Sequence, residues 1–147
     1  MKLSVLFSLV LVLTSPYTYA EPDCGDYLAA FNKKPDNLEF IGCEDFARGG
    51  QQHSEAKYRV SGTHAAAVED YLVKVFNMRK LRFYCCGWEP EGGRTGGYSR
   101  MINKVDYIYA ISMYSADTYA PGLEKKKNWQ KIHFFHVRVT LYNPGTL

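Results

Sequence analysis

The sequence predicts an α+β domain with a mainly antiparallel five-stranded sheet, two helices and two disulfides. The predicted order along the chain is helix, strand, strand, helix and then three strands, and the connections between strands are short. Short connections favour antiparallel pairing, with the helices on one face of the sheet. The four cysteines are an even number in a chain that begins with an export signal, which favours disulfides over free thiols.

Residues 1–20 have the pattern of a signal peptide. Lys2 supplies the positive start, and the apolar run Leu3–Leu13 is too short to span a bilayer well. Small residues around Ala20 predict cleavage after it, although an uncleaved membrane anchor is the alternative. We therefore expect a periplasmic or secreted protein in which residues 21–147 form a single domain, with no membrane contact after cleavage. The formal net charge of +3 is too small to indicate nucleic acid as a partner.

The first half of the domain is predicted to contain two helices and two strands. Asp26–Lys34 has a short amphipathic pattern that predicts a helix. Leu38–Cys43 is predicted as a short strand, with Leu38 and Phe40 on one face and Ile41 and Cys43 on the other. Glu55–Val60 alternates between apolar and polar side chains, as a strand with one solvated face does. Thr63 is a plausible N-cap for the longest predicted helix, His64–Met78, because its hydroxyl can accept a hydrogen bond from a free backbone N–H.

The second half is predicted to add three strands. Leu81–Glu89 is predicted as one continuous central strand that carries two adjacent cysteines. Pro90–Gly97 contains four glycines and predicts a mobile loop. Val105–Met113 and Ile132–Tyr142 alternate strictly and predict two long strands, joined through a connection at Thr118–Asn128.

The cysteine pattern favours two bonds that leave the central strand in opposite directions. Side chains of neighbouring strand residues point to opposite faces, so Cys85 and Cys86 should diverge. A bond between them would close a strained ring and break the strand. We therefore expect each of them to pair with either Cys24 or Cys43, and the sequence leaves both such connectivities open.

Three segments carry a resemblance to a known family. They are Tyr58-Arg-Val-Ser-Gly62, Val68-Glu-Asp-Tyr-Leu72 and Leu81–Glu89 with its Cys-Cys-Gly-Trp-Glu core. Together they resemble a bacterial domain-of-unknown-function family, family 4952, whose members are small exported proteins with the same double cysteine. The resemblance implies export and a disulfide-linked α+β fold, and it supplies no catalytic residues. Small exported bacterial proteins of this kind are often similar in character to immunity proteins, which block a toxin.

The glycine-rich loop and the strand before it are predicted to bind a protein partner. They combine aromatic and charged side chains, of which Trp, Tyr and Arg dominate the energetics of interfaces. The predicted partner-binding residues are Trp88, Glu89, Glu91, Arg94 and Tyr98. For Trp88 the alternative is packing in the core against a disulfide. We expect an exported periplasmic binding protein, of the type of an immunity inhibitor of a toxin or exported enzyme.

An enzymatic role is the alternative function. A small secreted hydrolase could use carboxylates near the loop, such as Glu89 and Glu91, if they faced each other across a cleft. No catalytic residue is assigned, because nucleophile motifs are missing from the sequence. His133 and His136 lie three apart on a predicted strand and point to opposite faces, so we expect no metal site and no cofactor.

Overall fold

The computed structural model describes residues 22–115 and 121–142. The predicted signal peptide and its cleavage after Ala20 lie outside these residues, as does part of the predicted connection at Thr118–Asn128. Among the described residues, none of the helices combines the length and the apolar character that a membrane crossing requires.

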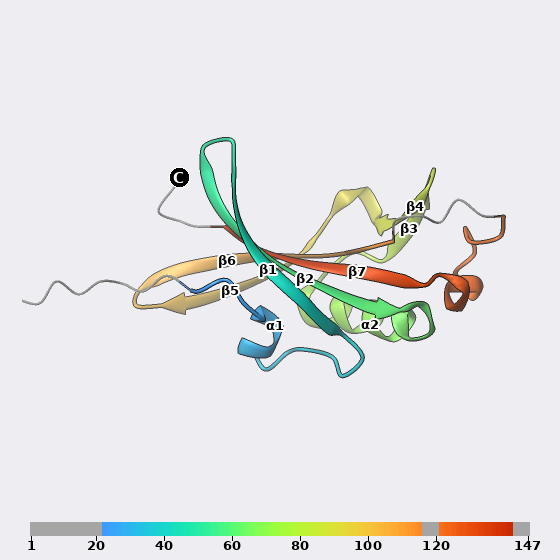
Figure 1. Cartoon of the computed structure of the whole chain (residues 1–147), viewed down its shortest axis with the longest axis horizontal. Coiled ribbons are helices and arrows are strands. Elements are labelled where there is room, and N and C mark those ends of the chain that lie inside the picture. Colours follow the sequence, from blue (N-terminus) through green and yellow to red (C-terminus); the bar gives the residue numbers. More distant parts are fainter. Residues whose placement is uncertain (1–21, 116–120, 143–147) are drawn as a thin grey trace, which may run out of the picture.

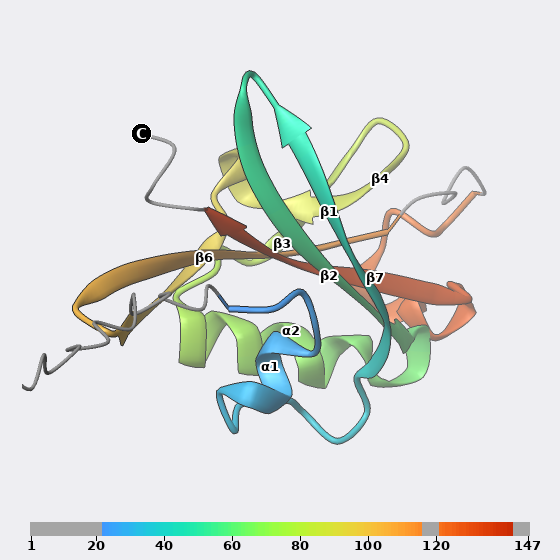
Figure 2. The same ribbon diagram turned by 60° about the vertical axis from the view of Figure 1, so that its left-hand side comes forward.

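The fold is α+β, as predicted, and is built on a five-stranded antiparallel sheet in the order β1-β2-β7-β6-β5. The elements are α1 (Tyr27–Ala30), β1 (Glu39–Arg48), β2 (Gln51–Ser61), α2 (Gly62–Phe76), β3 (Leu81–Tyr84), β4 (Gly87–Pro90), the 3-10 helix η1 (Glu91–Gly93), β5 (Gly96–Ile102), β6 (Val105–Tyr114), the 3-10 helix η2 (Lys126–Lys131) and β7 (Phe134–Tyr142). Both α-helices lie on one side of this sheet (Figures 1 and 2). The separate β3–β4 hairpin begins against α2 and lies beside the end of β6, where Trp88 forms a bridge with Ser115.

The core lies between the sheet and the two α-helices. Strict alternation turns one face of β2, β6 and β7 toward the helices, and cross-strand neighbours such as Tyr58 and Val137 meet there. Tyr27 of α1 packs against Tyr109 of β6 with ring centroids 5.2 Å apart. The backbone N–H of Leu28 donates to the Tyr58 hydroxyl at 3.1 Å, which fixes α1 over β2.

The long helix packs through a stripe of small and apolar side chains. Ala65, Val68, Leu72 and Phe76 are all buried, at the three- and four-residue spacing of one helix face. At its first residue, Gly62, a Cβ atom would overlap backbone carbonyl oxygens of η2 and the residue after it. Glycine at this position therefore allows the helix start and η2 to approach each other closely.

Element boundaries differ from the predictions at three places. The first helix is a single turn with Asp26 as its N-cap, whose carboxylate accepts from the Ala29 N–H. The long helix begins at Gly62, with Ser61 rather than Thr63 in the N-cap position. The residues Asp45–Gln52, whose Gly49-Gly50 pair predicts a loop, instead form the tip of a long β1–β2 hairpin, which turns at these two glycines with positive φ.

The membership of the sheet also differs from the prediction. Leu81–Glu89 is not one central strand, because the chain reverses within it to form the β3–β4 hairpin. The fifth strand of the main sheet is β5, which begins inside the predicted mobile loop. A Cβ atom on Gly96 would lie 2.8 Å from the Phe76 carbonyl oxygen, so glycine is needed where β5 passes the end of α2.

The prediction of two disulfides is confirmed, but the predicted connectivity is wrong. The bonds join Cys24 to Cys43 and Cys85 to its neighbour Cys86. The argument against a bond between neighbours assumed a continuous strand, in which the side chains diverge. At Cys85 the backbone instead has a φ of 49° and turns, so the two side chains come together.

Candidate functional site

The tip of the β3–β4 hairpin is a tight turn made by the adjacent cysteines. Tyr84 and Gly87 are paired, so Cys85 and Cys86 are the residues of the turn. The N–H of Cys86 donates to the carbonyl oxygen of Tyr84, which closes the turn around Cys85. Tyr84 and both cysteines are exposed. The hairpin therefore presents an aromatic ring and a covalent ring of two sulfurs at its end.

The base of the hairpin is held by Trp88. Its ring is buried, with its centroid 5.0 Å from that of Trp129 in an edge-on arrangement and 5.8 Å from that of Phe83. Its indole N–H donates to the Leu123 carbonyl oxygen at 2.9 Å. Its backbone pairs with Ser115, directly after β6. These contacts fix the hairpin to the body of the domain, so only its tip projects.

A buried carboxylate also anchors the hairpin. The Glu69 side chain in α2 is fully buried, and one of its oxygens accepts from the N–H of Leu81 at 2.7 Å, at the start of β3. The other oxygen accepts from the Lys126 ammonium of η2, which also lies 4.6 Å from the centroid of the Trp129 ring. One side chain thus ties α2, the hairpin and η2 together. A buried charge is tolerated because it is paired and hydrogen-bonded.

One cavity, of about 620 Å³, lies between the hairpin tip and the open face of the sheet. Its lining includes Tyr84, Cys85, Cys86 and Glu89 from the hairpin side, and Ser112, Tyr114 and Arg138 from the sheet. The Arg138 guanidinium stacks on Tyr114, 4.4 Å from the ring centroid, and its Nε lies 3.6 Å from a carboxylate oxygen of Glu55. The cavity therefore joins the disulfide to a stacked aromatic and cationic surface.

A second cavity, of about 740 Å³, lies on the other side of the hairpin, beside the end of α2. Glu91 lines this cavity and pairs with Arg82 at 2.7 Å, whereas Glu89 lines the cavity that contains the disulfide. The two carboxylates that a hydrolase would have to place in one cleft therefore line different cavities. A pair that acts across a single glycosidic bond has to share one cleft.

The predicted partner-binding residues fall into two groups. Glu89, Glu91 and Arg94 are exposed around the hairpin. Trp88 is buried beneath the tip, so the structure supports packing rather than an exposed anchor for this residue. Tyr98 lies away from the hairpin and packs against Phe31 of the α1 region, with ring centroids 4.4 Å apart. A role for these residues in binding a partner stays a prediction.

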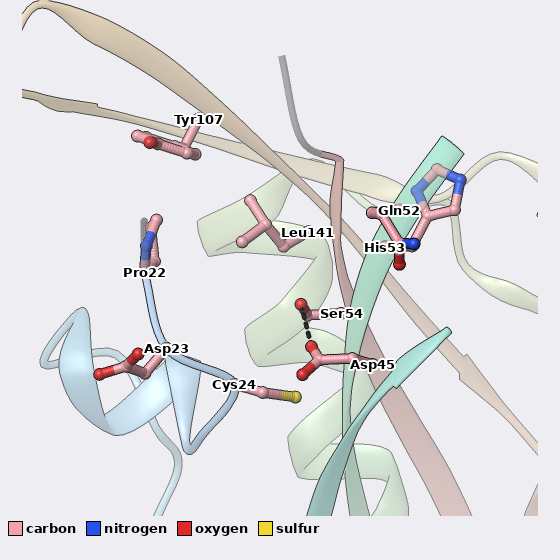
Figure 3. Close-up of a pocket in the computed structure, with 9 residues that line it drawn as sticks. All are labelled: Pro22, Asp23, Cys24, Asp45, Gln52, His53, Ser54, Tyr107 and Leu141. Carbon is pink, nitrogen blue, oxygen red and sulfur yellow. Dashed lines mark hydrogen bonds between the residues drawn. The ribbon is translucent and has the colours of Figure 1, made fainter. Parts of the chain in front are cut away.

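A third cavity, of about 310 Å³, lies beside the Cys24–Cys43 bond (Figure 3). It is lined by Pro22, Asp23, Cys24, Asp45, Gln52, His53, Ser54, Tyr107 and Leu141. The Ser54 hydroxyl donates to the Asp45 carboxylate at 2.5 Å, while the Asp23 carboxylate turns away from that pair (Figure 3). The two carboxylates therefore do not converge on one point in the cavity.

The tyrosines near this cavity are poor acids. Burial raises the pKa of Tyr27; the nearby Ser54 hydroxyl lowers it, and the Asp45 and Asp23 carboxylates raise it further. Burial also raises the pKa of Tyr109 to about 12. These hydroxyls stay protonated at neutral pH, so neither is a ready general base. Within residues 22–115 and 121–142, no three Cys, His, Asp or Glu side chains gather as a metal site.

Glu69, the buried carboxylate that holds the start of the hairpin, was not singled out from the sequence. Its signal was present, because Glu69 falls in phase with Ala65, Leu72 and Phe76 on the apolar stripe of α2. An acidic residue on a buried helix face needs a partner.

A protein-family model matches part of the chain. The model of a domain of unknown function, DUF4952, matches residues 16–88. The chain belongs to this family. The match extends from before α1 to Trp88, so it includes Glu69, the hairpin turn and all four cysteines. Comparison with curated proteins found no match, and neither did comparison with solved structures.

Proposed function

We propose that this DUF4952 protein is an exported binding protein of the immunity type, whose partner is a toxin or an exported enzyme. The observation that carries the proposal is the hairpin, with an exposed tip at Tyr84, Cys85 and Cys86 above a base buried at Trp88. The two disulfides indicate a protein outside the cytoplasm, where such bonds persist. The export signal predicted at residues 1–20 extends this to the periplasm or the exterior.

The rigidity of the hairpin supports a role in binding. Association loses free energy whenever flexible side chains and loops have to be ordered at an interface. Here the tip is closed by a covalent ring, and its base is held by the Trp88 and Glu69 hydrogen bonds. Little further ordering is needed when a partner docks. Tyr84 supplies the aromatic side chain that interfaces favour.

The charges around the tip suit a polar rim. Glu89 is exposed in β4, Arg94 is exposed beyond the base of the hairpin, and the Arg82–Glu91 pair lines the other cavity. In protein interfaces, a ring of polar and charged groups commonly surrounds an aromatic centre. We therefore place the contact surface on Tyr84, the cysteine turn and Glu89, with Trp88 as a support from below rather than a contact.

The proposal is tested by mixing the mature protein with the product of the adjacent gene and measuring the affinity of the complex by calorimetry. Tyr84→Ala is expected to weaken a stoichiometric complex at least tenfold. The matched control is Tyr142→Ala, because Tyr142 has a similar exposed fraction, 46% against 41%, and lies at the end of β7, outside the proposed contact surface. The proposal fails if the adjacent product does not bind and no stoichiometric partner is captured, or if both variants weaken binding equally.

A further inference from the structure

We propose that the Cys85–Cys86 bond is a thiol-reactive site, at which a small-molecule thiol attaches covalently and opens the turn of the β3–β4 hairpin. The inference goes beyond the proposed binding function and does not depend on it, because the reaction requires only this protein and the thiol.

The Cys85–Cys86 bond is accessible from solvent. Both cysteines of this bond are exposed, and both line the cavity of about 620 Å³ between the hairpin and the sheet. Cys24 and Cys43 are half-buried, and Cys43 packs against the hydrophobic core. A thiolate must reach a sulfur to attack it, so exchange favours the exposed bond. The cavity gives a small thiol space beside the two sulfurs.

The Cys85–Cys86 bond closes a very small loop of the chain. A disulfide stabilises a fold mainly by restricting the unfolded chain, and the effect grows with the number of residues enclosed. Cys24 and Cys43 are 19 positions apart, whereas Cys85 and Cys86 are neighbours. A bond between neighbours restricts almost nothing beyond the turn itself. Opening it should therefore leave the domain folded, as a reversible modification requires.

The hairpin is also held by contacts that do not involve the Cys85–Cys86 bond. Glu69 holds the start of β3, and Trp88 holds β4 through its ring, its indole N–H and its backbone. The turn itself depends more on the bond, because Cys85 has a φ of 49°, in a region that residues with a Cβ disfavour. Opening the ring lets the turn leave this conformation while the base stays in place. The reaction would thus reshape the tip alone.

The chemistry is a thiol–disulfide exchange. A thiolate of the small molecule attacks the Sγ of one cysteine, and a new sulfur–sulfur bond forms between them. The Cys85–Cys86 bond breaks, and the other cysteine leaves as a thiolate that takes a proton from water. A second thiol molecule can then attack the mixed disulfide, which yields the two free cysteines and the oxidised form of the small thiol. No other oxidant or reductant is needed.

The test treats the oxidised mature protein with reduced glutathione under native conditions. Reaction is stopped with N-ethylmaleimide at increasing times, and peptide mapping by mass spectrometry locates the glutathione and maleimide adducts. We expect glutathione on Cys85 or Cys86, with maleimide on its neighbour. We expect this to appear at least ten times faster than any adduct on Cys24 or Cys43. Circular dichroism should show that the fold is retained.

Two controls isolate the reaction. S-methylglutathione, whose sulfur is blocked, should give no adduct. Folded Cys85→Ser/Cys86→Ser protein treated with reduced glutathione should give no adduct at Cys24 or Cys43 over the same period. The proposal is overturned if Cys24–Cys43 opens as fast as Cys85–Cys86. It is equally overturned if Cys85 and Cys86 react only when the protein unfolds.

Discussion

The two disulfide regions of this protein use the same bond for different purposes. Cys24–Cys43 joins the segment before α1 to strand β1 across 19 positions of the chain. Loop-closure entropy assigns such a bond about 3 kcal/mol of stabilisation. Cys85–Cys86 closes no loop beyond the two residues themselves. The first bond therefore stabilises the fold, whereas the second only fixes the shape of an exposed turn.

The hairpin compensates for the small contribution of its disulfide with buried contacts. The Glu69 carboxylate accepts from the Leu81 N–H at its start, the Trp88 indole N–H donates to the Leu123 carbonyl oxygen, and the Trp88 ring packs against Trp129. The N-terminal segment is also held by buried contacts, among them the Leu28–Tyr58 hydrogen bond and the packing of Tyr27 against Tyr109. Its turn of helix is four residues long, and one of its buried hydroxyls, that of Tyr27, has no hydrogen-bond partner among the described residues. The Cys24–Cys43 bond therefore adds covalent support to a short segment that already packs in the core.

The largest effect is expected when the hairpin loses its buried anchor. Glu69→Ala leaves the Leu81 N–H and the Lys126 ammonium without their acceptor and opens a cavity beside α2. The Lys126 ammonium is half exposed and can turn to water, so the loss comes from the unsatisfied Leu81 N–H, about 1–3 kcal/mol, and from the cavity, about 2 kcal/mol more. We therefore expect a loss of about 3–5 kcal/mol of unfolding free energy. Urea unfolding measures the loss. Glu69→Gln is the control, because its amide oxygen can still accept from Leu81, so it should lose less.

The next effect tests the covalent half of the comparison. Cys24→Ser/Cys43→Ser is expected to lower the free energy of unfolding by about 3 kcal/mol, because the unfolded chain regains the freedom of the enclosed loop. Urea unfolding of the oxidised variant against the oxidised parent gives the value. A loss below that of the Cys85→Ser/Cys86→Ser variant would contradict the assignment of the stabilising role to this bond.

The main sheet was largely predictable, because β2, β6 and β7 alternate between buried and less buried side chains. Tyr58 and Val60, Tyr109 and Ile111, and Val137 and Val139 all face the helices as the pattern indicates. The exceptions are β1, whose register shifts between Phe40 and Gly42, and β5, where glycines hide the strand pattern although Gly96 is required for packing against Phe76. Alternation reports a half-buried strand only where side chains are present to carry it.

The hairpin could not be recognised from alternation. A continuous strand would put Phe83 and Trp88 on opposite faces, yet the turn pairs them, with ring centroids 5.8 Å apart. Hairpin turns are normally signalled by Asn, Asp or Gly at positive φ, and here Cys85 occupies that position. Alternation therefore did not reveal that Trp88 is buried and that Tyr84 is exposed at the tip.

A smaller effect is expected from the exposed bond. Cys85→Ser/Cys86→Ser should lower the free energy of unfolding by about 1 kcal/mol, since little chain entropy is restricted and serine at a positive φ is modestly unfavourable. Chemical unfolding gives the difference from the parent. A loss of the size expected for the Cys24–Cys43 pair would mean that the vicinal bond supports the whole hairpin, which would remove the contrast between the two regions.

The smallest effect separates the bond from the backbone angle that it holds. In Cys85→Gly/Cys86→Ser, glycine adopts the φ of 49° without a Cβ penalty, although it also gives the unfolded chain more freedom. The two contributions oppose each other, so we expect a loss of about 0.5 kcal/mol or less relative to the parent. If the glycine variant is no more stable than the serine variant, the positive φ at Cys85 is not what the bond maintains. If it is more stable, the covalent ring serves to hold a left-handed residue at the tip, because glycine can replace it in that role.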